Sequence, residues 1–406
     1  MATCPYPTHK NPQPISWENL TVSFCRQGCG RTLFSCPHCQ EANRPLARYC
    51  RQCGEAVSFA AAQHDNISPL QSGRNESAKL SDYGILDVQS IKTYKGLLIV
   101  VGDRSVLLYD LHQIHQPLFH FQPPDGRLVR GVTFVEGDGE EVLVTTSRGV
   151  YRLDLLTTPP ATATVYEAAV GRYITHPVAS CAKQLYALEL DESAQCSRLI
   201  RLPDQEVLTF DGVGHSLVRL TGERLFFSTR DRAFLFADGK VLEQSLPDSL
   251  TDTEAAYSQA QEMIYLVGES GLWRIRVSSA ELAPVNLPTR LLGAPRLAAQ
   301  GDNVFIAHSQ GFLVLDPFGG LRWDSTQQYI RAESDGLNPQ VTENYVLFTA
   351  LGQNGGSDLR IHAVNNLNDY KPLVYEQRLL CPPLLTNGRL FGAVGGTGTA
   401  VLNSST

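Results

Sequence analysis

The residues best suited to chemistry in this sequence are cysteines, because seven of the ten lie within the first 53 positions. Cys36 and Cys39 form one Cys-x-x-Cys pair, and Cys50 and Cys53 form another after ten intervening residues. Each pair sits on a tight turn that directs two sulfurs to one point, and two such pairs complete the tetrahedral thiolate set that Zn²⁺ prefers. The spacing therefore predicts a structural zinc site formed by these four cysteines.

The remaining ligand candidates predict a second zinc site with a less regular spacing. Cys25 and Cys29 are separated by three residues, and Cys4 and His9 by four. One alternative replaces His9 with His38, although His38 lies inside the turn of the first site. Another joins Cys25 and Cys29 to the first Cys-x-x-Cys pair, which leaves the second pair without partners. We favour two sites because this arrangement uses all seven clustered cysteines.

The segment from Cys4 to Gly54 resembles a double zinc ribbon, a small module of many bacterial and archaeal proteins. The second ribbon matches the family's spacing, whereas the first has irregular spacing and His9 in place of a cysteine. The resemblance implies two structural zinc ions, since a core this small needs a metal to fold and a closed four-ligand site has no position for a catalytic water. A basic cluster in the module is a candidate docking surface for protein or nucleic acid: Arg44, Arg48, Tyr49 and Arg51.

Charge and composition divide the chain into three parts. Residues 1–60 carry six basic and three acidic side chains, and the rest of the chain carries 28 and 38. The polar, aperiodic segment 61–80 is typical of a flexible linker. We therefore predict a double zinc ribbon at 1–60, a linker at 61–80 and an acidic domain at 81–406, whose negative charge disfavours nucleic-acid binding.

From about Gly84 onward, the sequence repeats a unit of two short apolar strands around a tight turn. A clear copy is Val304–His308, followed by a turn through Gly311 and then Phe312–Asp316. Eight units spaced by about 40 to 45 residues predict an all-β fold, a β-propeller with eight blades. Seven blades are the alternative if the unit near Asp191 is irregular. The turns are centred near residues 103, 148, 191, 231, 270, 310, 355 and 397.

The ends of the repeat region predict how the ring closes. The last unit, Leu379 to Asn403, has room for three strands, so a segment around Lys79 to Ile85 is expected to supply its outer strand. Closure of this kind removes exposed sheet edges. Residues 309–323 resemble a quinoprotein-type repeat, with a glycine turn, a Leu-Asp ending and Trp323. The repeat region as a whole resembles quinoprotein-like and WD-repeat propellers, although the Trp-Asp marks of WD repeats are absent.

Catalytic motifs are missing from the sequence. It has no adjacent cysteine pair to cover a quinone, no Gly-x-Ser-x-Gly and no His-Glu-x-x-His. His112, His115 and His120 are close in sequence, but no cysteine or carboxylate pattern joins them, and we interpret them as loop residues. We predict no catalytic residues and no cofactor other than zinc.

These patterns predict a non-enzymatic scaffold or adaptor that binds protein partners within a cytoplasmic multi-protein system, of a defence or ATPase-associated type, in bacteria. This function rests on fold analogy. The first ten residues lack the apolar core of an export signal, and the longest apolar stretch, near Leu97 to Val101, is too short to span a membrane. The alternatives are an enzyme or ligand sensor that uses the propeller channel, and nucleic-acid binding through the zinc ribbon.

Overall fold

The computed structural model describes two parts of the chain. The first comprises residues 22–24, 32–36, 38–43, 50 and 52–53, and the second runs from 76 to 405 with gaps at 136–139, 158, 182–183, 204, 238, 248–253, 269–270, 288–289, 292–294, 310, 326–336, 352–355 and 397–398. The described residues contain β-strands and two short 3-10 helices, η2 (Leu80–Tyr83) and η3 (Pro124–Gly126). They include no helix with the length and apolar character needed to cross a membrane.

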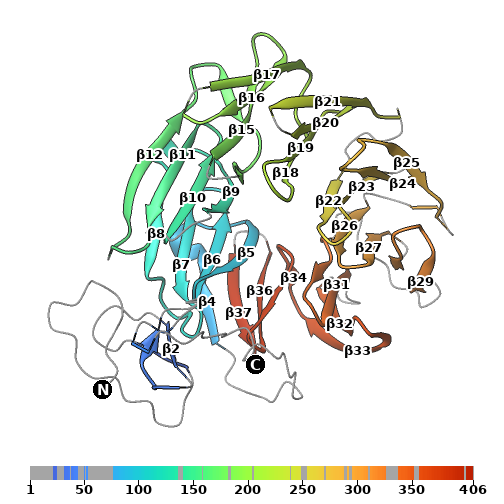
Figure 1. The fold of residues 1–406 in the computed structure, drawn as a ribbon. Coiled ribbons are helices and arrows are strands. Elements are labelled where there is room, and N and C mark those ends of the chain that lie inside the picture. The colour runs from blue at the N-terminus through green and yellow to red at the C-terminus, as the bar shows by residue number, and fades with distance from the viewer. Residues whose placement is uncertain are drawn as a thin grey trace.

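Eight antiparallel sheets form a closed ring, which confirms the all-β class and the eight-bladed propeller (Figure 1). The first four blades contain these strands: β5 (Val88–Tyr94), β6 (Leu97–Gly102), β7 (Val106–Asp110) and β8 (Phe119–Phe121) in blade 1; β9 (Val129–Phe134), β10 (Glu141–Thr146), β11 (Gly149–Asp154) and β12 (Ala161–Glu167) in blade 2; β13 (Arg172–Ile174), β14 (Ala179–Cys181), β15 (Gln184–Asp191), β16 (Cys196–Arg201) and β17 (Gln205–Asp211) in blade 3; β18 (Ser216–Arg219), β19 (Leu225–Ser228), β20 (Arg232–Ala237) and β21 (Lys240–Ser245) in blade 4.

The other four blades follow the same order from the inner to the outer strand. They contain these strands: β22 (Glu254–Ser258), β23 (Met263–Gly268), β24 (Gly271–Arg276) and β25 (Leu282–Val285) in blade 5; β26 (Arg296–Gln300), β27 (Asn303–His308), β28 (Gly311–Leu315) and β29 (Leu321–Asp324) in blade 6; β30 (Gln340–Val341), β31 (Tyr345–Leu351), β32 (Ser357–Ala363) and β33 (Asn366–Tyr375) in blade 7; β34 (Arg378–Leu379), β35 (Leu384–Thr386), β36 (Arg389–Gly396), β37 (Thr399–Ser405) and β4 (Glu76–Lys79) in blade 8. Each turn predicted from the sequence falls between, or at the end of, the second and third strands of a blade.

Two blades have a divided innermost strand. In blade 3, β13 and β14 both pair with β15, and in blade 8, β34 and β35 both pair with β36. The unit near Asp191 is therefore irregular, as the alternative supposed, yet it still forms a complete blade. The count of eight is unaffected because the divided strand occupies one position in the sheet.

The ring closes where β4 pairs with β37, which joins the two ends of the repeat region (Figure 1). Lys79 lies opposite Val401, and Glu76 lies opposite Ser404. The predicted clasp is confirmed, but the strand is 76–79 and not 79–85, since η2 follows it. The 3-10 turn ends at Gly84 with φ of 73°, and it allows both Leu80 and Ile85 to be fully buried. β4 also lies inside the predicted linker 61–80, so the propeller begins earlier than residue 81.

The core consists of layers between neighbouring blades. Along β6, Leu98 and Val100 pack against blade 8, whereas Ile99 and Val101 pack against blade 2. This alternation follows from the two-residue period of a strand, and it explains why β6 is apolar at every position. Aromatic rings fill the layer of blades 3 and 4, where Phe227 and Phe234 stack with centroids 4.8 Å apart.

Polar side chains add contacts between blades at the repeat distance. The Lys92 ammonium donates to the Val132 carbonyl oxygen at 3.1 Å, and the Ser258 hydroxyl donates to that of Gly301 at 2.9 Å. The Trp323 indole N–H donates to Asn368 Oδ1 at 3.2 Å. These partners are 40 to 45 residues apart, so equivalent positions of successive blades hold the ring together.

Candidate metal centre

A three-stranded sheet positions the N-terminal cysteines. The antiparallel strands β1 (Val22–Phe24), β2 (Thr32–Ser35) and β3 (Ala42–Asn43) pair in sequence order. The chain turns between β2 and β3, and Cys36 directly follows β2. The first Cys-x-x-Cys pair therefore occupies the turn at one end of this sheet.

Both Cys-x-x-Cys turns have the same hydrogen bond to sulfur. The backbone N–H of His38 donates to Cys36 Sγ at 3.4 Å, and that of Gln52 donates to Cys50 Sγ at 3.4 Å. The first turn is closed by the Gln40 N–H, which donates to the Cys36 carbonyl oxygen at 2.8 Å. Gln40 has φ of 58°, so a non-glycine residue takes the left-handed position here. Such N–H donors stabilise the thiolate form that a metal binds.

The four sulfurs of Cys36, Cys39, Cys50 and Cys53 converge, with all of them within 4.8 Å of one another. Cys36 Sγ lies 3.7 Å from Cys53 Sγ, and Cys39 Sγ lies 3.5 Å from Cys50 Sγ. A tetrahedral zinc ion with Zn–S bonds of about 2.3 Å requires S–S separations of about 3.8 Å. All four cysteines are free thiols, so the observed spacing fits a metal and not a disulfide.

The electrostatics of the cluster also call for a cation. The backbone N–H of Glu41 lowers the pKa of Cys39, but desolvation and the other three thiols outweigh it, and the pKa rises to about 12. Thiols this close resist ionisation unless a positive charge lies between them. A metal cation held by the four sulfurs would supply that charge, and a closed set of four sulfur ligands would leave no open coordination position for a substrate or water.

The second predicted site lies outside the described residues. Its candidate ligands Cys4, His9, Cys25 and Cys29 stay a prediction, as does the basic cluster of Arg44, Arg48, Tyr49 and Arg51. His38, the alternative ligand, is exposed on the turn of the first site.

The three clustered histidines have separate surroundings. The His112 backbone N–H donates to Asp110 Oδ1 at 2.8 Å, His115 Nε2 lies 3.8 Å from a Glu76 carboxylate oxygen, and His120 contacts the Tyr83 ring edge-on. His112 and His115 lie between β7 and β8, as the loop interpretation predicted. His120 is instead part of strand β8, where it lies opposite Leu107 of β7. Among the described residues, the four-cysteine group is the only His, Cys, Asp and Glu cluster with metal-binding geometry.

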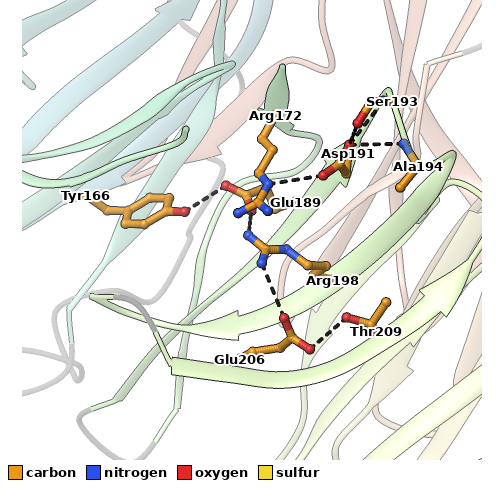
Figure 2. Close-up of polar contacts among 9 residues, drawn as sticks. All are labelled: Tyr166, Arg172, Glu189, Asp191, Ser193, Ala194, Arg198, Glu206 and Thr209. Atoms are coloured by element: carbon orange, nitrogen blue, oxygen red, sulfur yellow. Dashed lines mark hydrogen bonds and ion pairs between the residues drawn. The ribbon is translucent and has the colours of Figure 1, made fainter. Parts of the chain in front are cut away.

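A charged network between blades 2 and 3 was not predicted from the sequence (Figure 2). Glu189 is fully buried on β15, where it accepts hydrogen bonds from the Tyr166 hydroxyl at 2.7 Å and from the Arg198 guanidinium. Arg198 also donates to Glu206 at 3.3 Å. The sequence signal that could have revealed this network was Glu189, a charged residue within a largely apolar strand, which lies opposite Arg198 on the neighbouring strand. Because Tyr166 comes from blade 2, the network joins two blades.

A second carboxylate of blade 3 shapes the turn after β15. Asp191 accepts hydrogen bonds from the Ser193 hydroxyl at 2.6 Å, from the Ala194 N–H at 3.1 Å and from the Arg172 guanidinium at 3.2 Å (Figure 2). These donors, the Ser193 hydroxyl foremost, lower the pKa of Asp191 to about 2. The carboxylate acts as a turn anchor.

Charged groups on the inner strands also contact neighbouring blades. Glu254 receives the Arg296 guanidinium at 2.7 Å and the Leu297 backbone N–H at 3.1 Å. The Lys92 ammonium contacts blade 2, as described above, and burial lowers its pKa. These groups join neighbouring blades at their inner strands.

The similarity of this chain to known proteins is limited to the fold. No protein-family model and no curated protein matches the sequence. Solved structures do match the structure of this chain. The chain is a β-propeller. A eukaryotic initiation factor structure has a TM-score of 0.50 at 7% identity, over 77% of this chain and 84% of that chain. The WD40 domain of SCAP from fission yeast has a TM-score of 0.45 at 12% identity (82% and 97% covered), and a streptogramin B lyase has 0.46 at 13% (68% and 93%).

Proposed function

We propose that this propeller is a non-enzymatic scaffold that binds protein partners. The observation that carries the proposal is a row of exposed apolar side chains on the connections that lead from one blade to the next. Leu86, Leu128, Val170 and Val213 precede blades 1, 2, 3 and 4, and they are 54%, 42%, 92% and 42% exposed. Because each blade runs through four alternating strands, all such connections lie on the same face of the ring.

The four apolar residues lie one to three residues before the inner strands of consecutive blades, so they recur on one face of the ring. Single exposed apolar residues are common, but a repeated set on one face is typical of an interaction site. Lys92 and Glu254, the charged groups described above on inner strands, contact neighbouring blades, which supports a structural use of these strands. A closed four-thiolate metal site supports the same interpretation of the N-terminal module.

We further propose that the N-terminal module binds Zn²⁺ and gives the scaffold a second rigid surface. Residues 1–60 would form the double zinc ribbon and the segment before β4 would link it to the propeller. The assembly is a cytoplasmic multi-protein system of a defence or ATPase-associated type, as the propeller analogy implies.

Affinity purification from the native host, followed by mass spectrometry, tests the scaffold. We expect a stoichiometric protein partner with the unmodified chain and its loss when Leu86, Leu128, Val170 and Val213 are all replaced by glutamate. The matched control is a variant in which Leu242 and Val374, which are exposed on outer strands, are replaced in the same way. This variant should retain the partner. Repeated purification without any stoichiometric partner would refute the proposal.

A further inference from the structure

The outer strand of each blade leaves one edge without a neighbouring strand, and most of these edges are protected. An unpaired edge pairs readily with another chain unless charges, proline or shortness prevent it. β8 is only three residues long, and β25 contains Pro284. The other protected outer strands carry charged residues or proline: Glu206 and Asp211 in β17, Lys240 and Glu243 in β21, Arg322 in β29, Lys371 and Pro372 in β33, and Glu76 and Lys79 in β4.

The outer strand of blade 2, β12, lacks this protection. Its sequence is Ala-Thr-Ala-Thr-Val-Tyr-Glu, and its first four residues are exposed. The single charge, Glu167, is at the end of the strand and is held by the Arg127 guanidinium at 2.6 Å. Residues 161–164, which precede a register shift at Val165, therefore form an exposed, uncharged and proline-free edge that favours strand pairing.

A groove runs beside this edge, between β12 and the outer strand of blade 1. Thr162 and Thr164 line one wall, because residues two apart on a strand face the same side. The rest of the lining consists of the aromatic side chains of Phe119, Phe121 and Tyr151 together with His120, Gln122 and Pro124. The Tyr151 hydroxyl accepts a hydrogen bond from Arg127 at 2.9 Å, so the ring is fixed in the wall. The groove is suited to an apolar side chain.

We propose that the edge of β12 binds an extended, uncharged segment of a partner protein as an added strand of blade 2, with one of its apolar side chains in the groove. Main-chain hydrogen bonds to the edge would give affinity, and the groove would select the side chain. The inference deepens the proposed scaffold function and rests on it, since it names the kind of segment that one surface binds.

Two observations favour a different protein over a second copy of this chain. In a symmetric antiparallel pair centred on Thr164, Val165 of each copy would lie opposite Ala163 of the other, so the irregularity of β12 at Val165 would interrupt the pairing. The two charges at the rim, Arg127 and Glu167, already neutralise each other, so the surface selects an uncharged segment.

Selection from a displayed library of random eight-residue peptides tests the inference with the complete chain. We expect enrichment of uncharged sequences in which apolar residues alternate, and we expect a synthetic peptide of the enriched sequence to bind in fluorescence anisotropy. Ala163→Glu adds a charge to the edge opposite Arg152 of β11, and Thr164→Glu adds one in the groove. Each should weaken binding at least tenfold, whereas Leu242→Glu on the outer strand of blade 4 should leave it unchanged.

Backbone methylation of the peptide and hydrogen exchange separate strand addition from other binding. We expect the methylated peptide not to bind, and amides within 161–167 to exchange more slowly when the unmethylated peptide is present. Failure to enrich any peptide, or binding that Ala163→Glu does not weaken, would overturn the inference. Self-association abolished by Ala163→Glu would also overturn it, by identifying a second copy as the occupant. If a host partner is purified equally well with Ala163→Glu, the scaffold stands and the edge site falls.

Discussion

Removing Arg198 should destabilise the propeller strongly, because it leaves a carboxylate buried without its counter-charge. Glu189 is fully buried and Arg198 is 14% exposed at its side chain, so water replaces little of the lost contact. In Arg198→Leu, the Glu189 carboxylate keeps the Tyr166 hydroxyl but loses the guanidinium. Breaking a buried ion pair by removing one partner costs about 3 to 5 kcal/mol, and we expect a loss of unfolding free energy in this range.

Replacing both partners by apolar residues should be far less harmful. In the double variant Glu189→Leu and Arg198→Leu, neither charge remains buried, and such replacements are often close to neutral. The two single substitutions and the double one form a cycle, from which we expect a coupling of at least about 3 kcal/mol. Urea unfolding followed by circular dichroism provides the free energies.

The control for this cycle is Glu206→Gln. Its carboxylate also contacts Arg198, but its side chain is 52% exposed, so we expect a change of under about 1 kcal/mol. A double variant that loses as much stability as the sum of the single variants would show that Glu189 and Arg198 are not coupled. Equal effects of Arg198→Leu and Glu206→Gln would contradict the difference expected from burial.

Three further predictions concern metal, pH and ring closure. Metal analysis should find at least one zinc ion per chain, or two if the second site is filled. The double variant Cys39→Ser with Cys53→Ser should bind one zinc ion fewer, and an unchanged zinc content would contradict the four-cysteine site. Burial foremost, with the nearby Arg389, lowers the pKa of His112 to about 4, so between pH 6.5 and 4 the unfolded chain binds more protons. Stability should therefore be full above pH 6.5 and decline toward pH 4, and a flat urea midpoint over this range would contradict the assignment. Arg389 contacts Glu76 and the Leu111 carbonyl oxygen across the ring closure, so Arg389→Met should lower the midpoint of thermal unfolding. Arg322 donates a hydrogen bond to Asn303 of its own blade, so Arg322→Met should lower the midpoint less. Equal effects of the two substitutions would refute this prediction.

The division of the chain into blades could be predicted because it depends on local sequence patterns. Short apolar strands around turns recur at the propeller period, so the pairing of segments such as Val304–His308 with Phe312–Asp316 followed without knowledge of distant contacts. The four converging thiols also followed from local spacing. A hydrogen-bonded turn after Cys36 brings Cys39 into position, whichever residue takes the left-handed site.

The features that depend on distant neighbours were missed. η2 ends the closing strand early, and Ile85 then lies against Gly102. A side chain at position 102 would place its Cβ atom 2.9 Å from the Ile85 side chain. The division of β13 from β14 depends on how the chain enters blade 3, and Glu189 depends on Tyr166 from another blade. Each is a tertiary contact that outweighs the local pattern.

The strand that completes the last blade has a consequence for biosynthesis. β4 is made before any other propeller strand, yet its partner β37 is made last, and the Arg389–Glu76 contact spans 313 residues. During translation, β4 cannot pair with β37 until the end of the chain has been made, so the ring can close only at that stage. A chain shortened past residue 75 from its beginning would therefore lose the outer strand of its last blade, although every later repeat would be intact.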